Sequence, residues 1–260
     1  MKIIKLESQK YPEKFGTKVK KLKATITEGS IFIKDDAPVG FYINDLPPTI
    51  TNLIAIADTE LRSANVPKTK MNRGTRKQAI AKGEEWVEQY SVVLGAAVPR
   101  AHMRRNYART TTIHGLKTAQ PFIKAMLLLC RAGEKLIEKY MPEQYNKQKQ
   151  LVKENVPERL GLTELFSSSI SNYNIAAPYH QDRGNLKGCV NLIFSVKKKV
   201  LGAHLHVPEY DLVIENSDNS LLVYPAYANM HGVTPINSVN LGGYRNSLVF
   251  YTINGLQKFM

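Results

Sequence analysis

The chain has 260 residues, enough to bury a full hydrophobic core in one domain. Its composition, 43% hydrophobic and 22% charged, is typical of a globular domain, and no run of about 18 apolar residues predicts a membrane span. The two cysteines, Cys130 and Cys189, form no CxxC pattern, which argues against a disulfide framework and a zinc knuckle.

The net charge of +14 is unevenly distributed. Residues 161–260 hold seven Lys and Arg against six Asp and Glu, so residues 1–160 carry almost all of the excess. A basic region beside a nearly neutral one suits a polyanion held next to a reaction chamber, although a solvated basic surface without a partner explains the same numbers. The first 15 residues lack the apolar stretch of a secretory signal, so we expect an intracellular protein, nuclear in a eukaryote and cytoplasmic in a phage or bacterium.

The first 97 residues mix short elements with basic stretches. Alternation over residues 31–34 predicts a short strand, and the lysine-rich stretch 18–23 is expected to form an exposed edge or an arm. The apolar segment 51–63 fits a strand or a helix. The cationic run 68–82 either contacts phosphates or is solvated. It is predicted to lead into a helix over 78–94, with Trp86 and Tyr90 facing the core.

Arginines cluster again in VPRAHMRRNYARTTTIHG, residues 98–115. Arg104 and Arg105 lie beside Tyr107, and cations interleaved with an aromatic ring can bind a nucleic-acid backbone and stack on a base. Arg104 and Arg105 are therefore candidate substrate contacts. Alternatively, one arginine lines a catalytic pocket and the others pair with carboxylates.

The clearest helix is predicted over residues 118–140. Apolar residues recur there at helical spacing, Thr118 is a suitable N-cap and Pro121 is tolerated in the first turn. Pro142 ends this helix, and the following residues up to Pro157 form a second amphipathic helix or an exposed extension. We expect residues 1–160 to be basic and largely helical, and to pack on the rest of the chain.

From residue 165 the hydrophobic period changes to that of strands. Five segments fit strands, with Gly, Asn and Pro turn signals between them: 166–175, 188–196, 210–215, 220–226 and 246–253. Short strands of this kind predict a double-sheet jelly roll or barrel. The expected fold class is α+β, with a catalytic jelly-roll core over residues 161–260 braced by the N-terminal helices, in one integrated domain.

The clearest chemical signal is YHQDRGN, residues 179–185. His180 and Asp182 stand two apart, so an extended strand would aim both side chains at one face. With His231 from the β-rich sequence downstream, they form the two-imidazole, one-carboxylate set that suits Fe(II) and leaves positions open for a co-substrate and dioxygen. Arg245 and Ser247 share one face of the last strand, where a guanidinium and a hydroxyl can bind a co-substrate carboxylate.

A second histidine pair competes for the metal. His204 and His206 also share one face of a strand, with Glu209 close behind, as in cupins. This alternative leaves the His-x-Asp pattern unexplained, so the set that includes His231 is preferred.

The pattern resembles the Fe(II)/2-oxoglutarate dioxygenases, with a histidine 49 residues after the His-x-Asp and an arginine 14 residues further on. The segments GAHLHVPEY, LLVYPA and HGVTPI, with the arginine-rich block upstream, narrow the resemblance to the TET/JBP group, which oxidises the 5-methyl group of cytosine or thymine in DNA. Residues 165–253 carry most of it. The Cys-rich zinc-binding region of animal TET enzymes is absent, so the compact protist, fungal or phage forms are more similar.

The resemblance implies a double-stranded β-helix whose open end holds the metal. It implies Fe(II) bound by His180, Asp182 and His231, and 2-oxoglutarate bound by Arg245 and Ser247. Molecular oxygen is then a further substrate.

The same resemblance implies residues for the substrate. Asn185 matches by position the asparagine that contacts the target base in TET proteins, and an amide can pair with a base edge as donor and acceptor. The alternative is an asparagine that serves the turn beside Gly184. Asn172 and Tyr173 lie on a strand approaching the metal, and Tyr173 is expected to stack on the base or to bond the co-substrate.

The leading hypothesis is a DNA base oxygenase acting on 5-methylcytosine or thymine, with no membrane and no obligate protein partner. One alternative keeps the iron chemistry but acts on an alkylated base, as in the AlkB-type demethylases that SNYNIAAPYHQD and RNSLVFY also resemble, or on a prolyl-type protein substrate. Another is a jelly-roll nucleic-acid binder without turnover.

Overall fold

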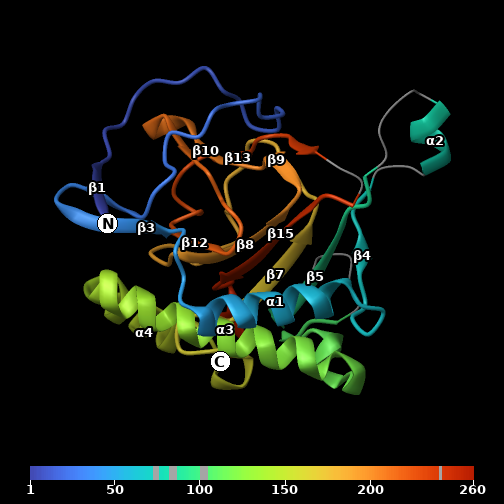
Figure 1. The fold of residues 1–260 in the computed structure, drawn as a ribbon. Helices are drawn as coiled ribbons and strands as arrows, with labels where there is room; N and C mark the ends of the chain where they lie inside the picture. Colours follow the sequence, from blue (N-terminus) through green and yellow to red (C-terminus); the bar gives the residue numbers. More distant parts are fainter. Residues whose placement is uncertain (73–75, 82–86, 100–104, 240–241) are drawn as a thin grey trace.

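A large sheet forms the middle layer of the protein in a computed structural model that describes residues 1–72, 76–81, 87–99, 105–239 and 242–260 (Figure 1). Its strands, in spatial order, are β1 (Lys2–Lys5), β2 (Ser30–Lys34), β3 (Ala37–Ile43), β12 (Ser220–Tyr224), β8 (Asn191–Lys198), β15 (Tyr244–Tyr251), β7 (Ser168–Tyr173), β5 (Tyr90–Ala97) and β4 (Thr69–Lys70), and β6 (Arg109–Thr110) pairs with β5. Except for β1 with β2, these pairs are antiparallel. Strands from both ends of the chain are therefore neighbours in one sheet.

Helices α1 (Pro48–Arg62), α3 (Gln120–Tyr140) and α4 (Pro142–Asn155) cover one face of this sheet (Figure 1). Their apolar residues, such as Ile54 and Met126, form one core with Phe194 and Phe250 of the sheet. Gly133 lets α3 lie close to β8, because a Cβ at this position would stand 2.3 Å from a methyl carbon of Leu192. No helix among the described residues is long and apolar enough to cross a membrane.

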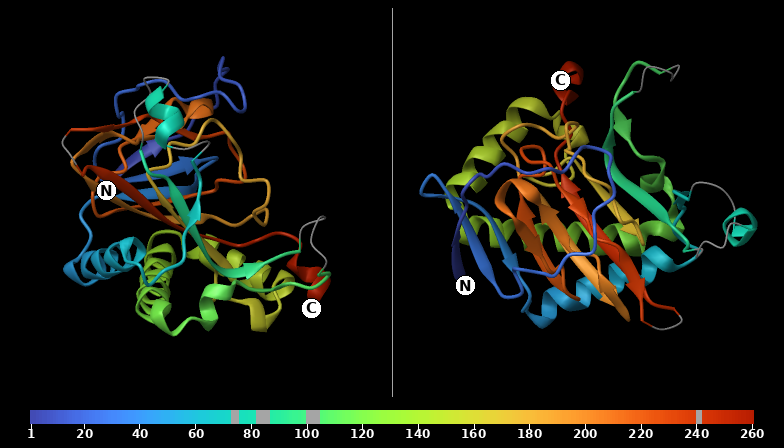
Figure 2. Two further views of the ribbon diagram at one scale, coloured as in Figure 1. Left: turned by 90° about the vertical axis from the view of Figure 1, so that its right-hand side faces the viewer. Right: turned by 90° about the horizontal axis from the view of Figure 1, so that it is seen from above.

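The other face of the sheet is covered by shorter strands (Figures 1 and 2). β11 (Leu212–Ile214), β10 (Leu205–Val207) and β13 (Gly232–Val233) form one small sheet, and β9 (Val200–Gly202) pairs with β14 (Ile236–Ser238). Residues of the small sheet, such as Leu205 and Ile214, share a second core with Phe32 and Leu222 of the large sheet. The two sheets face each other and form the predicted jelly roll.

The remaining elements of the described ranges are one short helix and five 3₁₀ turns. They are α2 (Arg76–Ala81), η1 (Thr112–Gly115), η2 (Lys117–Ala119), η3 (Glu158–Leu160), η4 (Pro208–Tyr210) and η5 (Leu256–Phe259).

The structure confirms the fold class and corrects three details of the first half. Residues 1–160 are not largely helical: they supply β1 to β6 of the large sheet as well as its helical cover. Of the helix expected over 78–94, the described residues contain α2 (Arg76–Ala81), and residues from Tyr90 onward form β5 instead, where pairing with β7 outweighs local helical spacing. Trp86 lies outside the described residues. Thr118 does not cap α3, because its Oγ1 donates to Asn65 O at 3.1 Å and the helix begins at Gln120.

Asp58 is the polar link between α1 and β15. Its buried carboxylate accepts hydrogen bonds from Tyr244 Oη at 2.8 Å and from Asn246 Nδ2, and pairs with Arg62 at 3.1 Å. Asp58→Ala leaves these donors without a partner, so we expect it to lower the free energy of unfolding by about 2–4 kcal/mol in urea denaturation. The control is Asp45→Ala, an exposed acid in the loop before α1, with an expected change below about 0.5 kcal/mol. Equal losses from both variants would contradict this account of Asp58.

Candidate active site

Three of the predicted ligands converge inside the jelly roll. His180 and His231 lie on two segments joined by an antiparallel bridge, with N–H···O bonds of 2.8 Å in both directions. One ligand atom from each of His180, Asp182 and His231 lies within 4.8 Å of the other two, and His180 Nε2 is 3.5 Å from Asp182 Oδ1. No other cluster of three such side chains occurs in the described part of the chain. This donor set suits Fe(II).

Backbone carbonyls set the tautomer of both histidines. His180 Nδ1 lies 2.8 Å from Pro178 O, and His231 Nδ1 lies 3.1 Å from Asn229 O. A carbonyl can only accept, so each Nδ1 carries the proton and each Nε2 keeps its lone pair for a metal. Burial, together with the neighbouring His180, lowers the pKa of His231 to about 4, and this imidazole is therefore neutral at pH 7.

Two asparagines orient the carboxylate of Asp182. Its Oδ2 accepts from Asn191 Nδ2 at 3.2 Å and lies 3.4 Å from Asn185 Nδ2, which also donates to Asn191 Oδ1 at 2.9 Å. Oδ1 faces His180 and is left for the metal. Sequence reasoning missed Asn191, because nothing in its strand distinguishes it until β8 is placed beside Asp182.

Arg245 lies deep in the same interior and is only 4% exposed. Its Nη1 donates to Ser247 Oγ at 3.2 Å, its buried Nε has no hydrogen-bond partner, and it forms no ion pair with a described residue. Burial lowers the pKa of Arg245 to about 10, so the side chain is still charged at neutral pH. A buried guanidinium without an ion-pair partner is costly, and a carboxylate in front of it would supply the missing hydrogen bonds. Arg245 and Ser247 thus fit the 2-oxoglutarate site.

A single cavity of about 240 Å³ joins these two groups of residues. Its walls include the three candidate ligands together with Arg245 and Ser247. The cavity is slightly smaller than a typical drug-sized pocket, which suits a small dicarboxylate beside a metal ion.

Comparison with known proteins identifies the family. Residues 100–254 match the model for Tet_JBP, the oxygenase domain of the 2OGFeDO superfamily, and this span is more than half of the chain. The chain belongs to this oxygenase family. Its superfamily uses Fe(II) and 2-oxoglutarate, and the donor set and the buried arginine fit both. No curated protein sequence matches the chain.

Solved structures of low sequence identity match the chain, and the first of them shares its fold. NgTET1 in complex with 5mC DNA is 14% identical with a TM-score of 0.61, covering 92% of this chain and 81% of that chain. OsALKBH1 is 12% identical with a TM-score of 0.42, covering 83% and 97%. A 2OG-Fe(II) oxygenase family protein from Burkholderia pseudomallei is 10% identical with a TM-score of 0.44, covering 82% of each chain.

A second hollow of the oxygenase continues beyond Asp182, and we call it the outer pocket. It shares Ile170, Asp182 and Val249 with the cavity, and its other lining residues are Gln181, Arg183, Gly184, Asn185 and Tyr251. Alternate residues of β15 trace the order of the whole site: Arg245 and Ser247 at the inner end, then Val249, then Tyr251 in the outer pocket. Arg183 and Gly184 are exposed, so the outer pocket reaches the surface.

Tyr173 differs from its predicted position. Neighbouring residues of a strand face opposite ways, so Asn172 lines the cavity while Tyr173 faces the helical layer. There its ring stacks on Tyr90, with centroids 4.4 Å apart, and on Tyr244 at 5.6 Å. Tyr173 therefore does not line the cavity, and it is removed from the substrate-binding set.

The other predicted substrate residues have mixed outcomes. Asn185 is buried in the wall of the outer pocket, where its amide nitrogen supports Asp182, and its contact with a base stays a prediction. Arg104 lies outside the described residues. Arg105 is half-buried in the segment that connects β5 to β6, and its Nε has no hydrogen-bond partner in the structure. Its role also stays a prediction.

The alternative histidines have structural partners. His204 Nδ1 lies 2.7 Å from Glu215 O, and His206 Nδ1 lies 2.6 Å from Tyr179 Oη. Glu209 instead accepts a hydrogen bond from Asn229. These three side chains do not form a second metal cluster within the described residues.

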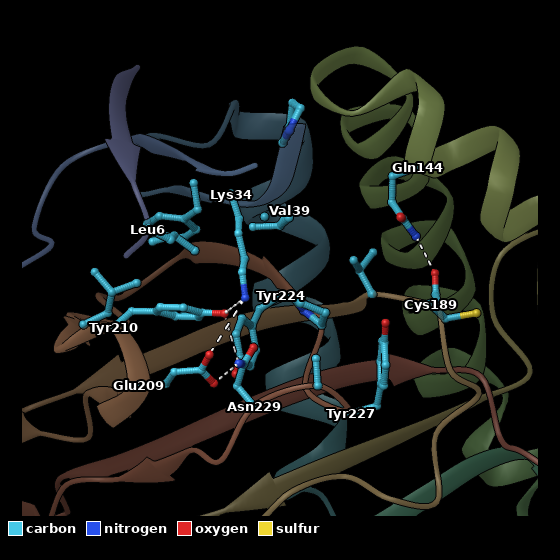
Figure 3. A pocket seen from close by; sticks show the side chains of 18 of the residues that line it. Leu6, Lys34, Val39, Gln144, Cys189, Glu209, Tyr210, Tyr224, Tyr227 and Asn229 are labelled. Atoms are coloured by element: carbon cyan, nitrogen blue, oxygen red, sulfur yellow. Dashed lines mark hydrogen bonds and ion pairs between the residues drawn. The ribbon is translucent and has the colours of Figure 1, made fainter. Parts of the chain in front are cut away.

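A separate pocket of about 380 Å³ contains the residues that support His231 from behind (Figure 3). Asn229, whose carbonyl accepts from His231, is held by its own Nδ2, which lies 2.5 Å from Glu209 Oε2 and 3.1 Å from Tyr210 Oη. Lys34 Nζ of β2 donates in turn to Tyr210 Oη at 2.9 Å. The first part of the chain thus helps to orient a candidate metal ligand.

Arg245→Met tests whether this guanidinium serves a ligand or the fold. We expect 2-oxoglutarate affinity of the Mn(II)-loaded protein to fall by more than roughly 100-fold in calorimetric titration, because two charge-assisted hydrogen bonds are lost. The metal-free protein should keep or raise its Tm, since an unpaired buried charge is removed. Arg62→Met is the matched control: Arg62 pairs with Asp58, so stability should fall while binding is kept. The same pattern for both variants would refute the assignment.

Buried imidazoles should make the stability of the metal-free protein depend on pH. Burial lowers the pKa of His114, His204, His206 and His231 from 6.5, the last to about 4. Below pH 6.5 the unfolded chain binds protons that the folded chain does not, so stability falls as the pH drops from about 7 toward 4. We expect the Tm of chelator-treated protein to decrease over this window, and His231→Gln to flatten the decrease. A Tm that is constant between pH 7 and 5 would contradict this prediction.

Proposed function

We propose that this oxygenase hydroxylates the 5-methyl group of 5-methylcytosine or thymine in DNA. The observation that carries the proposal is the outer pocket, which adjoins Asp182 and has the Asn185 amide and the Tyr251 ring in its lining. The Asn185 nitrogen already donates to Asp182 and Asn191, so the amide oxygen is the group left to accept from a base edge. An acceptor of this kind, together with an aromatic face, is a suitable lining for a base turned out of its stack. A base held there presents its methyl group to the metal side of the cavity.

The net charge of the chain and its membership of the family both favour a nucleic acid as substrate over a small metabolite. The net charge is +14, and almost all of the excess lies in residues 1–160, outside the segment with the metal ligands. The matched family is Tet_JBP, and the NgTET1 structure of similar fold holds 5mC DNA. A substrate carrying one negative charge per phosphate is attracted by such an excess.

Each group of residues has its own part in the proposed reaction. His180, Asp182 and His231 would hold Fe(II), which together with 2-oxoglutarate activates dioxygen for oxidation of a C–H bond. Arg245 and Ser247 bind the distal carboxylate of 2-oxoglutarate and fix its orientation. Ile170 and Val249, shared by the cavity and the outer pocket, keep water away from the reacting methyl group.

The test is nucleoside mass spectrometry after incubation with Fe(II), 2-oxoglutarate and air. The substrates are duplexes that contain 5-methylcytosine, unmodified thymine or an N-methylated base. We expect hydroxymethylated pyrimidine from the wild type and none from Asp182→Ala, because the carboxylate ligand is lost. His204→Gln is the matched control, a histidine outside the proposed triad, and should retain the product.

The products distinguish the possible substrates. Demethylation of the N-methylated base without oxidation of any 5-methyl group would favour an AlkB-type repair enzyme. Succinate formation without any altered base would retain the oxygenase and reject DNA bases as its substrate, which would direct the search to prolyl-type protein substrates. DNA binding without succinate would point to a binder that has no turnover.

A further inference from the structure

The N-terminal strap, residues 10–23, is attached to the backbone beside both candidate histidine ligands. Gly16 N donates to Tyr179 O at 2.8 Å, and Tyr179 N donates to Thr17 O at 2.9 Å, next to His180. Val19 is buried against Gly232, the neighbour of His231, so closely that a Cβ on the glycine would lie 2.5 Å from a Val19 methyl carbon. In Figure 2 (right) the blue strap crosses the orange strands of the small sheet. Its position at the active site is therefore fixed by backbone contacts.

Phe15 projects from the strap on a tight turn. Thr17 N donates to Lys14 O at 3.2 Å and Gly16 has φ of +79°, as in a type II turn, where a glycine is favoured. The Phe15 side chain is 55% exposed, and the Arg183 guanidinium lies 5.4 Å from the centre of its ring. Arg183 also lines the outer pocket, so the aromatic ring lies at the edge of the proposed substrate site.

The strap carries an excess of positive charge that the protein does not neutralise. Residues 10–23 contain six lysines and one glutamate, and all six lysines are exposed. None of these lysines forms an ion pair with a carboxylate among the described residues, whereas Lys2, Lys34, Lys149 and Lys198 each do. Lys14, Lys18 and Lys20 line a shallow hollow over Tyr179, one residue from the ligand His180. An external polyanion is the natural counter-charge.

We propose that the strap binds duplex DNA around the target base, with its lysines on the flanking phosphates and Phe15 as an apolar wedge. Phe15 fills the space in the base stack that the target base leaves when it enters the outer pocket, as apolar wedges do in other DNA-binding proteins. This inference rests on the proposed function, because it takes a DNA base as the substrate. Single exposed apolar residues are common, but Phe15 stands on a fixed turn, contacts Arg183 and lies at the edge of the outer pocket. An acidic protein surface would also match the charge of the lysines, but it would give no reason for the exposed Phe15 ring, which DNA does.

The lysines are tested by the salt dependence of DNA binding. Lys18→Gln/Lys20→Gln is compared with Lys124→Gln/Lys135→Gln, which removes the same charge from exposed positions on α3, in the helical layer. We expect the slope of log K against log salt to fall by about 1 to 2 for the strap variant, one unit per lost phosphate contact, and to stay unchanged for the control. Equal slopes for the two variants, or strap-dependent binding of an acidic peptide but not of DNA, would overturn the proposal.

Phe15→Ala tests the wedge. With 2-aminopurine at the target position of a duplex, we expect wild type to raise the fluorescence and Phe15→Ala to lose at least half of that rise, while binding to single-stranded DNA stays within twofold. Leu128→Ala on α3, which removes a 41% exposed apolar side chain far from the strap, should behave as wild type. A full rise in Phe15→Ala, or no rise in wild type, would refute the wedge.

These readouts do not depend on turnover. If no base is oxidised yet the strap variants still lose duplex binding and base opening, the proposed function fails and the strap assignment stands. If bases are oxidised and the strap variants bind and open DNA as wild type does, only the strap assignment fails.

Discussion

The two-residue period of β15 is the constraint on which the rest of the structure depends. Leu248 and Phe250 face the helices and belong to the main core, while Arg245, Ser247 and Val249 face the jelly-roll interior and line the cavity. A slip of one residue would turn the arginine toward the helices and a leucine toward the metal site. The register is held by β8 and β7 on either side and by the bond from Asn246 to Asp58 of α1. The helical layer therefore supports the chemistry although it supplies no candidate ligand.

The interior of the jelly roll is polar at a cost that the rest of the fold must offset. A buried guanidinium with an unpartnered Nε and a buried imidazole that is hard to protonate are both less stable than apolar residues of similar size. The continuous core between helices and sheet compensates, with Phe194, Leu248 and Phe250 fully buried. Such local cost is expected where a site is prepared for an anion and a metal ion, because the ligands then restore the missing interactions.

Sequence reasoning succeeded where the determining pattern is local. Arg-x-Ser places two side chains on one face of β15. His180 forms only an isolated bridge and Asp182 lies outside the strands, yet the two-residue spacing still brings both side chains to one cavity, as predicted. Sequence reasoning failed where long-range pairing decides. Placing Tyr173 correctly requires knowing which alternate residues of β7 face the jelly-roll interior. Asn191 became recognisable only when β8 was placed beside Asp182. Residues from Tyr90 onward form a strand because β7 is available as a partner, a contact that local periodicity does not contain.

The segment that matches the family, residues 100–254, does not hold the site by itself. Lys34 reaches from β2 to Tyr210, which contacts the Asn229 amide behind His231, and the strap bonds to both backbone groups of Tyr179 beside His180. Each candidate histidine ligand is therefore supported by sequence that precedes the matched segment. The same early sequence carries the unneutralised lysines, so one stretch of chain both supports the candidate metal ligands and holds the positive charge proposed to attract DNA. A contact between DNA and the strap would then act directly on the backbone that positions His180, and would couple the proposed DNA binding to the geometry of the candidate metal site.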